Sequence, residues 1–343
     1  MTDTTELTAW RAVAELYRHF FAGLVLRTVA QRGPKDAAEL VFRTFRRQHH
    51  ARFLPGLKKL GLDTLPHAVA AASYHYLSNR IGGVSVEFMP ESDRKAWVRF
   101  PPPRWVWPTV TICAIPTEVS AAMLRGWQAH NGVSLGNPRL GFVCTGMTPD
   151  GQPGLEGYFL EHDHDLAPED RLRFARHESA PPFDPARAPS LNPDAWPAAR
   201  LAKAHRGYAM EYIRSALPEL LQAFGPEAAQ FLGGGAARLV GMQMYPDTAA
   251  GLGITPEPGA ASFARFMVRL AEATGDRATL ERDGDAYVVR QERWTLMRDV
   301  PEAENLADTV LLACWAGLLE GAAMAHDKRM TVRREGLAWR IGR

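Results

Sequence analysis

Gly33-Pro34-Lys35-Asp36-Ala37-Ala38 recurs in the second half of this chain as Gly225-Pro226-Glu227-Ala228-Ala229. Gly61 lies 27 positions after Pro34, and Gly253 lies 27 positions after Pro226. Further along, residues 95–99 resemble residues 285–290, and two tryptophans 22 positions apart are matched by two that are 21 apart (Trp105 and Trp127, Trp294 and Trp315). Matching landmarks in one order indicate a tandem duplication; the alternative is a coincidence of common elements.

Both halves also show the same succession of local patterns. In the first half, apolar residues at helical spacing predict helices at 6–31, 36–52 and 65–77, and alternating runs predict a hairpin of 84–88 with 96–100. A helix at 116–127 and strands at 140–145 and 157–160 follow. The expected fold is α+β, with two tandem-duplicated modules that each pack helices on a small, mostly antiparallel sheet.

The length of 343 residues exceeds what one hydrophobic core usually organises, so two domains are expected. Residues 176–199 have little apolar periodicity and many prolines (Pro181, Pro182, Pro185, Pro189, Pro193 and Pro197). This composition is typical of a linker or of a crossover that follows the surface. We therefore expect a first module at 1–175 that carries the site, a linker at 176–199 and a second module at 200–343.

The charge and motif content narrow the function classes. A net charge of +2, from 40 Lys+Arg against 38 Asp+Glu, gives no indication of a nucleic-acid or membrane surface. The N-terminus lacks a signal-peptide pattern and the three cysteines are scattered, so a cytoplasmic location with reduced thiols is expected. Gly233-Gly234-Gly235 lacks the Lys-Ser/Thr of a phosphate loop and is expected to break a helix. No cofactor is expected, and the expected partner is a small molecule, with a homodimer left open.

The end of the second half carries a further pattern: Arg293-Trp294, Cys314-Trp315 in a helix with Gly317 and Gly321, Thr331-Val332-Arg333-Arg334, and Gly336-Leu337-Ala338-Trp339-Arg340-Ile341. It resembles the carboxy-terminal part of the small-molecule-binding domain shared by 4-vinyl-reductase-type and L-2-amino-thiazoline-4-carboxylic acid hydrolase-like proteins. The resemblance implies an α+β domain that encloses a small ligand or acts on a small heterocyclic acid. The hydrolase-like pattern ends in Gly-Asp followed by cysteine, which this chain lacks, so no catalytic residue is carried over.

The densest polar cluster, Glu161-His162-Asp163-His164-Asp165, directly follows a predicted strand. Alternate residues of a strand share a face, so His162 and His164 would point the same way. Imidazoles suit proton transfer near neutral pH, with Asp163 as the orienting carboxylate. These three are the candidate catalytic residues. A metal held with a ligand from elsewhere and a solvated loop are the alternatives, and no metal is assigned.

The stretch 126–157 is long and rich in Gly, Asn and Pro, which is typical of a functional loop. His130 and Asn131 are candidate substrate-binding residues at a pocket mouth, with Trp127 in its wall. Glu156 is a candidate general base, although a turn carboxylate would give the same pattern. The corresponding stretch of the second half is shorter and lacks these polar residues, so the site is placed in the first half.

Three more residues are candidates for the same pocket. His75 lies on the third predicted helix, where its neighbour on the same face is Asn79. Glu87 lies opposite Phe88 in an apolar strand and is either on the exposed face or a buried catalytic carboxylate. Arg99 could pair with a substrate carboxylate or be a solvated hairpin arginine.

Two functions remain open. The first is a hydrolase or lyase that acts on a small, carboxylate-bearing metabolite by acid–base chemistry. The second is a non-catalytic, sensor-type protein that binds a small molecule in an aromatic-lined pocket. No output domain of a sensor is visible in the sequence, which favours the enzyme.

Overall fold

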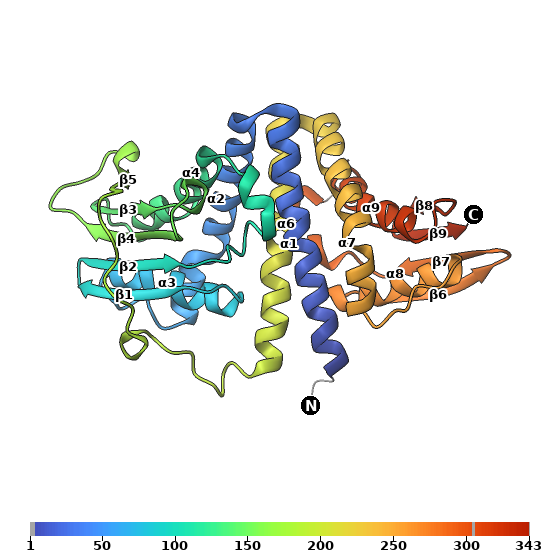
Figure 1. Ribbon diagram of the computed structural model, residues 1–343, viewed down its shortest axis with the longest axis horizontal. Coiled ribbons are helices and arrows are strands. Elements are labelled where there is room, and N and C mark those ends of the chain that lie inside the picture. Colours follow the sequence, from blue (N-terminus) through green and yellow to red (C-terminus); the bar gives the residue numbers. More distant parts are fainter. Residues whose placement is uncertain (1–3, 304–305, 343) are drawn as a thin grey trace. The chain divides into compact units, whose positions relative to one another are not determined.

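The computed structural model describes residues 4–303 and 306–342, and the chain forms two compact units, drawn in Figure 1. Unit 1 combines the residues up to Arg27 with those from Ala198 onward, and unit 2 is Thr28–Pro197. The boundary therefore falls inside the first helix, α1 (Thr4–Arg32). The expected first module, 1–175, differs from unit 2 because residues up to Arg27 pack with the C-terminal half.

Unit 2 packs helices on one face of a five-stranded sheet. Its longer elements are α2 (Pro34–Lys59), α3 (His67–Ile81), β1 (Glu87–Ser92), β2 (Lys95–Phe100), α4 (Thr117–Gly126), β3 (Leu140–Gly146), β4 (Leu155–Glu161) and β5 (Leu172–Phe174). Short helices join them: η1 (Thr109–Ala114), η2 (Gln128–His130), α5 (Asn131–Ser134), η3 (Thr148–Asp150), η4 (Pro168–Arg171) and η5 (Pro185–Arg187). The strand order is β1-β2-β4-β3-β5, antiparallel except for the parallel pair β3–β5.

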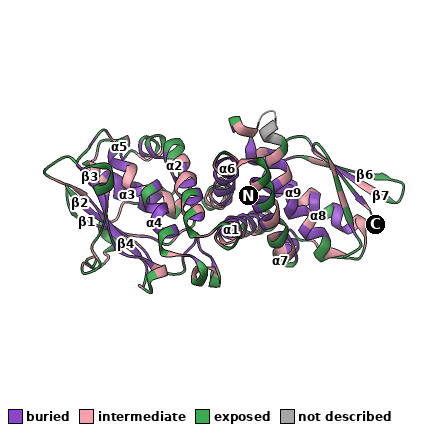
Figure 2. Cartoon of the chain, turned by 90° about the horizontal axis from the view of Figure 1, so that it is seen from above, coloured by how far each residue is buried: buried purple, intermediate pink, exposed green. Residues whose placement is uncertain are grey.

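Unit 1 has a four-stranded antiparallel sheet with the order β6-β7-β9-β8. Besides the first part of α1 it contains α6 (Ala198–Ala229), a π-helical turn η6 (Gln230–Gly234), α7 (Gly235–Gly251), α8 (Ala260–Thr274), β6 (Ala278–Asp283), β7 (Ala286–Gln291), η7 (Thr295–Met297), η8 (Pro301–Ala303), α9 (Leu306–His326), β8 (Thr331–Glu335) and β9 (Ala338–Gly342). In both units the buried residues gather where helices meet the sheet (Figure 2). The expected α+β class with mostly antiparallel sheets is confirmed.

The two halves of the chain share their order of elements and the order of their first four strands. Three helices, a hairpin, a helix and a second hairpin follow one another in each half, beginning with α1 and with α6, and the strand order β1-β2-β4-β3 parallels β6-β7-β9-β8. The backbone repeats as well, since Gly33 has φ 90 and ψ 171 and Gly225 has φ 80 and ψ 171, each before a proline. Positive φ suits glycine because it has no Cβ. These features agree with a tandem duplication, which remains a prediction.

Two local predictions were wrong because packing outweighed propensity. The helix expected at 36–52 continues to Lys59 although Pro55 removes one backbone donor, and Phe53 and Leu57 on either side of Pro55 are buried. The glycines at 233–235 do not end a helix, since the chain passes through the π-helical turn directly into α7. An extra residue per turn lets the helix continue with a local bulge.

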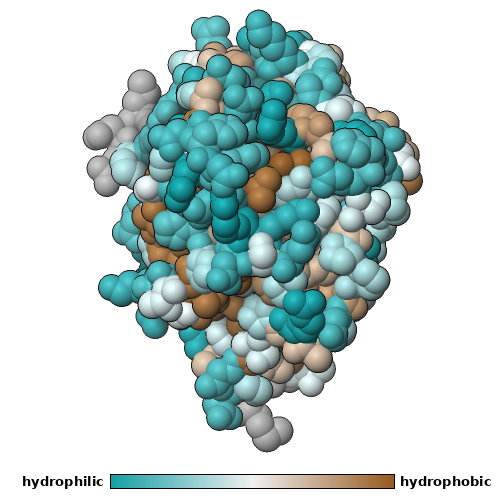
Figure 3. All heavy atoms as spheres, turned by 90° about the vertical axis from the view of Figure 1, so that its left-hand side faces the viewer, coloured by the Kyte–Doolittle hydropathy of each residue, from teal (hydrophilic) through white to brown (hydrophobic). Residues whose placement is uncertain are grey.

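Residues 176–197 follow the surface of unit 2 instead of hanging free between the two halves. Ala180 and Phe183 pack on an apolar patch of the sheet formed by Met89, Trp97, Val143 and Tyr158. The Ala180 N–H donates to Glu156 Oε1 at 3.0 Å, and Arg187 donates to the Pro90 carbonyl at 3.0 Å. The segment thereby shields the outer face of the sheet, and hydrophilic atoms dominate the side of the molecule in Figure 3.

Helices α7 and α9 approach closely through glycines. A Cβ on Gly241 would overlap the Leu318 carbonyl oxygen, and a Cβ on Gly321 would overlap that of Arg238. Within α9, Thr309–His326 is the one stretch among the described residues that is long and apolar enough to cross a membrane, and 61% of it is buried inside the protein. Its apolar composition is that of a core helix packed on several sides.

Replacing Gly321 by alanine should therefore destabilise unit 1. The new methyl group meets backbone that cannot move aside, and overpacking of this kind typically costs about 1–3 kcal/mol of the free energy of unfolding. Gly207→Ala is the matched control, because Gly207 is an exposed residue of α6 with no atom near its missing Cβ. That change should stabilise the helix by about 0.5–1 kcal/mol. Urea unfolding measures both, and an unchanged midpoint for Gly321→Ala would contradict the close approach.

Candidate functional site

The register of the unit 2 sheet divides the predicted site residues between its two faces. Glu87 lies opposite Arg99, and Arg99 lies opposite Glu156, so all three project from the outer face. Phe159 projects from the inner face, where its ring stacks on His75 of α3 with centroids 5.3 Å apart. The expectation that His75 and Glu87 face one pocket is therefore wrong, because the sheet lies between them.

On the outer face, Arg99 is surrounded by both carboxylates. Its Nε donates to Glu87 Oε2 at 2.5 Å, and its Nη1 lies 3.8 Å from Glu156 Oε2. Glu156 Oε1 also accepts hydrogen bonds from Thr145 Oγ1 at 2.9 Å and from the Ala180 N–H at 3.0 Å. Glu156 thus fastens the covering segment to the sheet, and Arg99, although partly exposed, is paired with both carboxylates.

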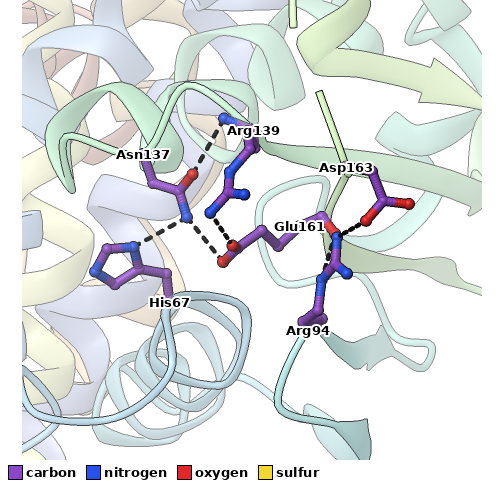
Figure 4. Close-up of polar contacts among 6 residues, drawn as sticks. All are labelled: His67, Arg94, Asn137, Arg139, Glu161 and Asp163. Carbon is purple, nitrogen blue, oxygen red and sulfur yellow. Dashed lines mark hydrogen bonds and ion pairs between the residues drawn. The ribbon is translucent and has the colours of Figure 1, made fainter. Parts of the chain in front are cut away.

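The cluster at 161–165 lies at the end of β4, shown in Figure 4. The Asp163 carboxylate accepts a hydrogen bond from Arg94 Nη2 at 2.6 Å, so it does not orient a histidine as expected. The rings of His162 and His164 are close, with centroids 5.6 Å apart, but Asp163 and His164 are exposed to solvent. The arrangement agrees with the solvated-loop alternative.

Glu161, the last residue of β4, belongs to a separate polar network. Its two carboxylate oxygens accept hydrogen bonds from Asn137 Nδ2 at 2.9 Å and from Arg139 Nη2 at 2.7 Å (Figure 4). Asn137 also lies 3.1 Å from His67 Nδ1 at the start of α3. This network ties the loop after α5 to the sheet and to α3, which is a structural role.

The four remaining candidates, His75, His130, Asn131 and Trp127, come together on the inner face of the sheet. His75 and Asn131 are buried, and Asn131 Nδ2 lies 3.1 Å from His75 Nε2. The amide donates to an unprotonated ring nitrogen, which leaves the proton of neutral His75 on Nδ1. The Trp127 ring lies 6.2 Å from His75, and Trp127 and His130 are half-buried.

The structure adds His49 of α2 to this group, a residue that was not predicted. Its ring lies 5.1 Å from that of His130 and 5.6 Å from that of Trp127, and its Nε2 lies 2.8 Å from Ser134 Oγ. A signal was present in the sequence, because residues four apart share a face of a helix and His49 stands between Phe45 and Phe53. We call His49, His75, His130 and Asn131 the histidine centre.

Burial keeps the imidazoles of the centre neutral. Desolvation lowers the pKa of His49 to about 2 and that of His75 to about 3. Desolvation and the charge of Arg46 lower the pKa of His130 to about 4. A neutral imidazole presents one acceptor and one donor nitrogen, so each ring can accept one hydrogen bond and donate another.

Several buried polar atoms of this region have no hydrogen-bond partner among the residues that the structure describes. They are His49 Nδ1, Trp127 Nε1, Gln128 Oε1 and Asn131 Oδ1. Buried polar groups are nearly always satisfied by protein, water or a ligand, so these atoms are available to an enclosed water or a polar ligand. The Asn131 amide can accept one more donor through Oδ1, and His49 Nδ1 faces the same region.

The corresponding positions of unit 1 are apolar. Pro34 and Gly61 correspond to Pro226 and Gly253, 192 positions later, and the same step takes His75 to Met267. Trp127 corresponds to Trp315, 188 positions later, and that step takes Asn131 to Leu319. Met267, Trp315 and Leu319 lie together in unit 1, where they line a cavity of about 10 Å³, which agrees with this predicted correspondence.

The same steps pair His49 with Gly241 and His130 with Leu318. Gly241 and Leu318 are in contact in unit 1, just as His49 and His130 are in unit 2. Where unit 2 has three histidines and an asparagine, unit 1 thus has glycine, methionine and two leucines. The imidazoles of the centre are therefore not needed to build this arrangement of helices and sheet.

Other candidate binding sites among the described residues have weaker support than the histidine centre. No three His, Cys, Asp or Glu side chains among them converge as a metal ion requires. An open hollow of about 560 Å³ in unit 1 is lined in part by Arg27, Arg238 and Glu320. There Arg238 pairs with Glu320, and Arg27 donates to the Phe231 carbonyl at 3.3 Å, so its charged groups are already engaged.

Comparison with protein-family models, curated proteins and solved structures gives no match to this chain. The resemblance to vinyl-reductase-type and hydrolase-like domains therefore stays a prediction.

The buried histidines should make the protein sensitive to acid. The folded state binds a proton at His75 only near pH 3, whereas the unfolded chain binds it near pH 6.5, so stability falls as pH drops below 6.5. Replacing His75 by methionine, the residue of unit 1, should remove about 1.4 kcal/mol per pH unit of this dependence. Urea unfolding at several pH values between 4.5 and 7.5 measures it.

The control is His164→Gln at an exposed position, which should leave the pH dependence as it is in the unaltered protein. Equal slopes for His75→Met and the unaltered protein would mean that His75 is protonated as easily in the folded as in the unfolded chain.

Proposed function

We propose that unit 2 is a hydrolase or lyase that performs acid–base chemistry on a small, carboxylate-bearing metabolite at the histidine centre. The observation that carries the proposal is the contrast between the units. Three histidines and an asparagine occupy unit 2 at positions where unit 1 builds the same arrangement from apolar residues. Burying polar groups costs stability, so their presence points to a function beyond folding.

His130 is the group proposed to exchange a proton with the substrate. It is half-buried, whereas His49, His75 and Asn131 are buried, so it is the member of the centre most accessible to solvent. His49 packs edge-on against it with ring centroids 5.1 Å apart and is held by Ser134. An anionic substrate beside His130 would raise its pKa from about 4 toward neutrality, where acid–base catalysis is most effective.

His75 and Asn131 are proposed to position the substrate. The hydrogen bond between them fixes the amide so that Asn131 Oδ1 is presented to a donor group. Trp127 offers an apolar surface beside them, and its ring lies nearly parallel to that of Tyr74, with an interplanar angle of 14° and centroids 6.4 Å apart. Aromatic walls with a few fixed polar groups are typical of small-molecule sites.

The second candidate function is binding without catalysis. The low pKa values of His49 and His75 favour it, because a very weak base transfers protons poorly at neutral pH. In that case the unpartnered polar atoms would hold a ligand that is released unchanged. Turnover in a screen decides between the two.

A screen of small carboxylic acids for hydrolysis or elimination tests the proposal. His130→Gln should lower turnover by about 10²–10⁴-fold, the usual loss when an acid–base partner is removed. Asn131→Leu, which installs the unit 1 residue, should mainly raise KM because it removes a positioning contact. Thermal melts confirm that both variants are folded.

His164→Ala is the matched control in the same screen, since it removes an exposed imidazole of the same unit. Its turnover should equal that of the unaltered protein. If His164→Ala loses turnover and His130→Gln keeps it, the reaction belongs to the cluster at 162–165 instead. Saturable ligand binding with no turnover of any acid would favour the sensor-type function.

A further inference from the structure

A group of basic side chains, Arg46, His50 and Arg171, lies next to the histidine centre. Arg46 of α2 is half-buried, and its guanidinium donates to the carbonyl oxygens of Gly126 and Arg125, each at 3.0 Å. Those bonds hold it at the C-terminal end of α4, beside His130. His50, also on α2, is exposed, and its ring lies 5.0 Å from that of His130.

Arg171 completes the group from another element. It ends η4, directly before β5, and β5 pairs with β3. Its charge acts on both Arg46 and His130. Its Nε is buried and has no hydrogen-bond partner among the described residues, so one donor of a charged side chain is left unused there. An unsatisfied charged donor is more costly than a neutral one.

The charges that act on His130, among the residues the structure describes, all have one sign. Arg46, His50 and Arg171 each disfavour its protonated form. The charge of Arg171, again positive, acts on Arg46 as well. Like charges held close together and partly away from water repel, and a negative group placed among them removes that cost.

We propose that Arg46, Arg171, His50 and His130 form an oxyanion subsite of unit 2, which binds the carboxylate or phosphoryl group of a small ligand. Guanidinium groups bind both kinds of oxyanion through paired N–H donors, and the unpartnered Nε of Arg171 supplies one of them. The inference rests on the proposed function and deepens it, because it assigns the residues that hold the acid group of the substrate. The remainder of the ligand would then extend toward Trp127 and Asn131.

Binding at this subsite is coupled to a proton. The groups that face His130 are Arg46, His49 and His50 of α2 and Arg171 of η4. A bound anion offsets their positive charge and adds an acceptor, so the pKa of His130 rises from about 4. At pH 5.5 the protein should therefore take up a proton as the anion binds, and affinity should weaken as the pH is raised.

The test is calorimetric titration of the full chain with inorganic phosphate and, separately, with acetate at pH 5.5. Two buffers of different ionisation enthalpy report the number of protons taken up. Arg171→Gln should weaken binding by about 10- to 100-fold, the equivalent of one charge-assisted hydrogen bond. Arg173→Gln is the matched control, because Arg173 is an exposed arginine two positions away whose charge acts on His162. It should bind as the unaltered protein does.

Arg171→Lys covers the case in which the glutamine variant is unstable. It keeps the charge but loses the planar pair of donors, so it should bind more weakly than the unaltered protein and more tightly than Arg171→Gln. Tighter binding of acetate indicates a carboxylate as the natural group, and tighter binding of phosphate indicates a phosphoryl group. Absence of binding, or equal loss in Arg171→Gln and Arg173→Gln, overturns the subsite.

The outcomes also separate this subsite from catalysis. If oxyanions bind through Arg171 and no acid is turned over in the screen, the subsite stands and the proposed hydrolase or lyase activity fails. If His130→Gln abolishes turnover of an acid but neither anion binds through Arg171, the activity stands and the subsite fails.

Discussion

The antiparallel register of β2 with its neighbours β1 and β4 decides which side chains of unit 2 can meet. Because successive residues of a strand alternate between faces, the register places Glu87, Arg99 and Glu156 in one row on the outer face. A shift of one residue would turn that row toward α3 and expose Phe159 instead. The outer row therefore fastens the covering segment, and the inner face of the sheet contacts the histidine centre.

Much of the fold could be predicted from periodicity and turn residues, because long apolar stripes and Gly-Pro pairs depend on local chemistry. What failed depends on tertiary packing: the continuation of α2 through Pro55, the π-helical turn at the three glycines, and the pairing of residues before Arg27 with the C-terminal half. At the site, His75, His130, Asn131 and Trp127 were singled out in the sequence, and the structure brings them together. Asp163 and His164 of the cluster at 162–165 are exposed instead, because neighbours in sequence need not share a pocket. His49 was not predicted, because its packing against His130 and Trp127 depends on the tertiary structure.

The two units show how one arrangement of elements supports different interiors. Trp127 and Trp315 hold corresponding places, yet one lies among imidazoles and the other beside methionine and leucine. Unit 1 still contains buried polar residues, such as Asp276, which accepts hydrogen bonds from the Thr295 N–H and from Gln291. These partners satisfy the Asp276 carboxylate. Buried polar atoms without a partner among the described residues occur in both units, for example Trp294 Nε1 in unit 1, but in unit 2 several of them gather at the histidine centre.

The division of α1 between the units has a consequence for synthesis on the ribosome. Unit 2 is continuous in sequence, so all of it has been made before most of unit 1 exists. Tyr17 of α1 accepts a hydrogen bond from Trp315 Nε1 at 2.9 Å, across 298 positions of the chain. Domains generally fold as units while the chain emerges. The first helix must therefore wait for its partners until the second half of the chain emerges, first Tyr212 of α6 and last Trp315 of α9.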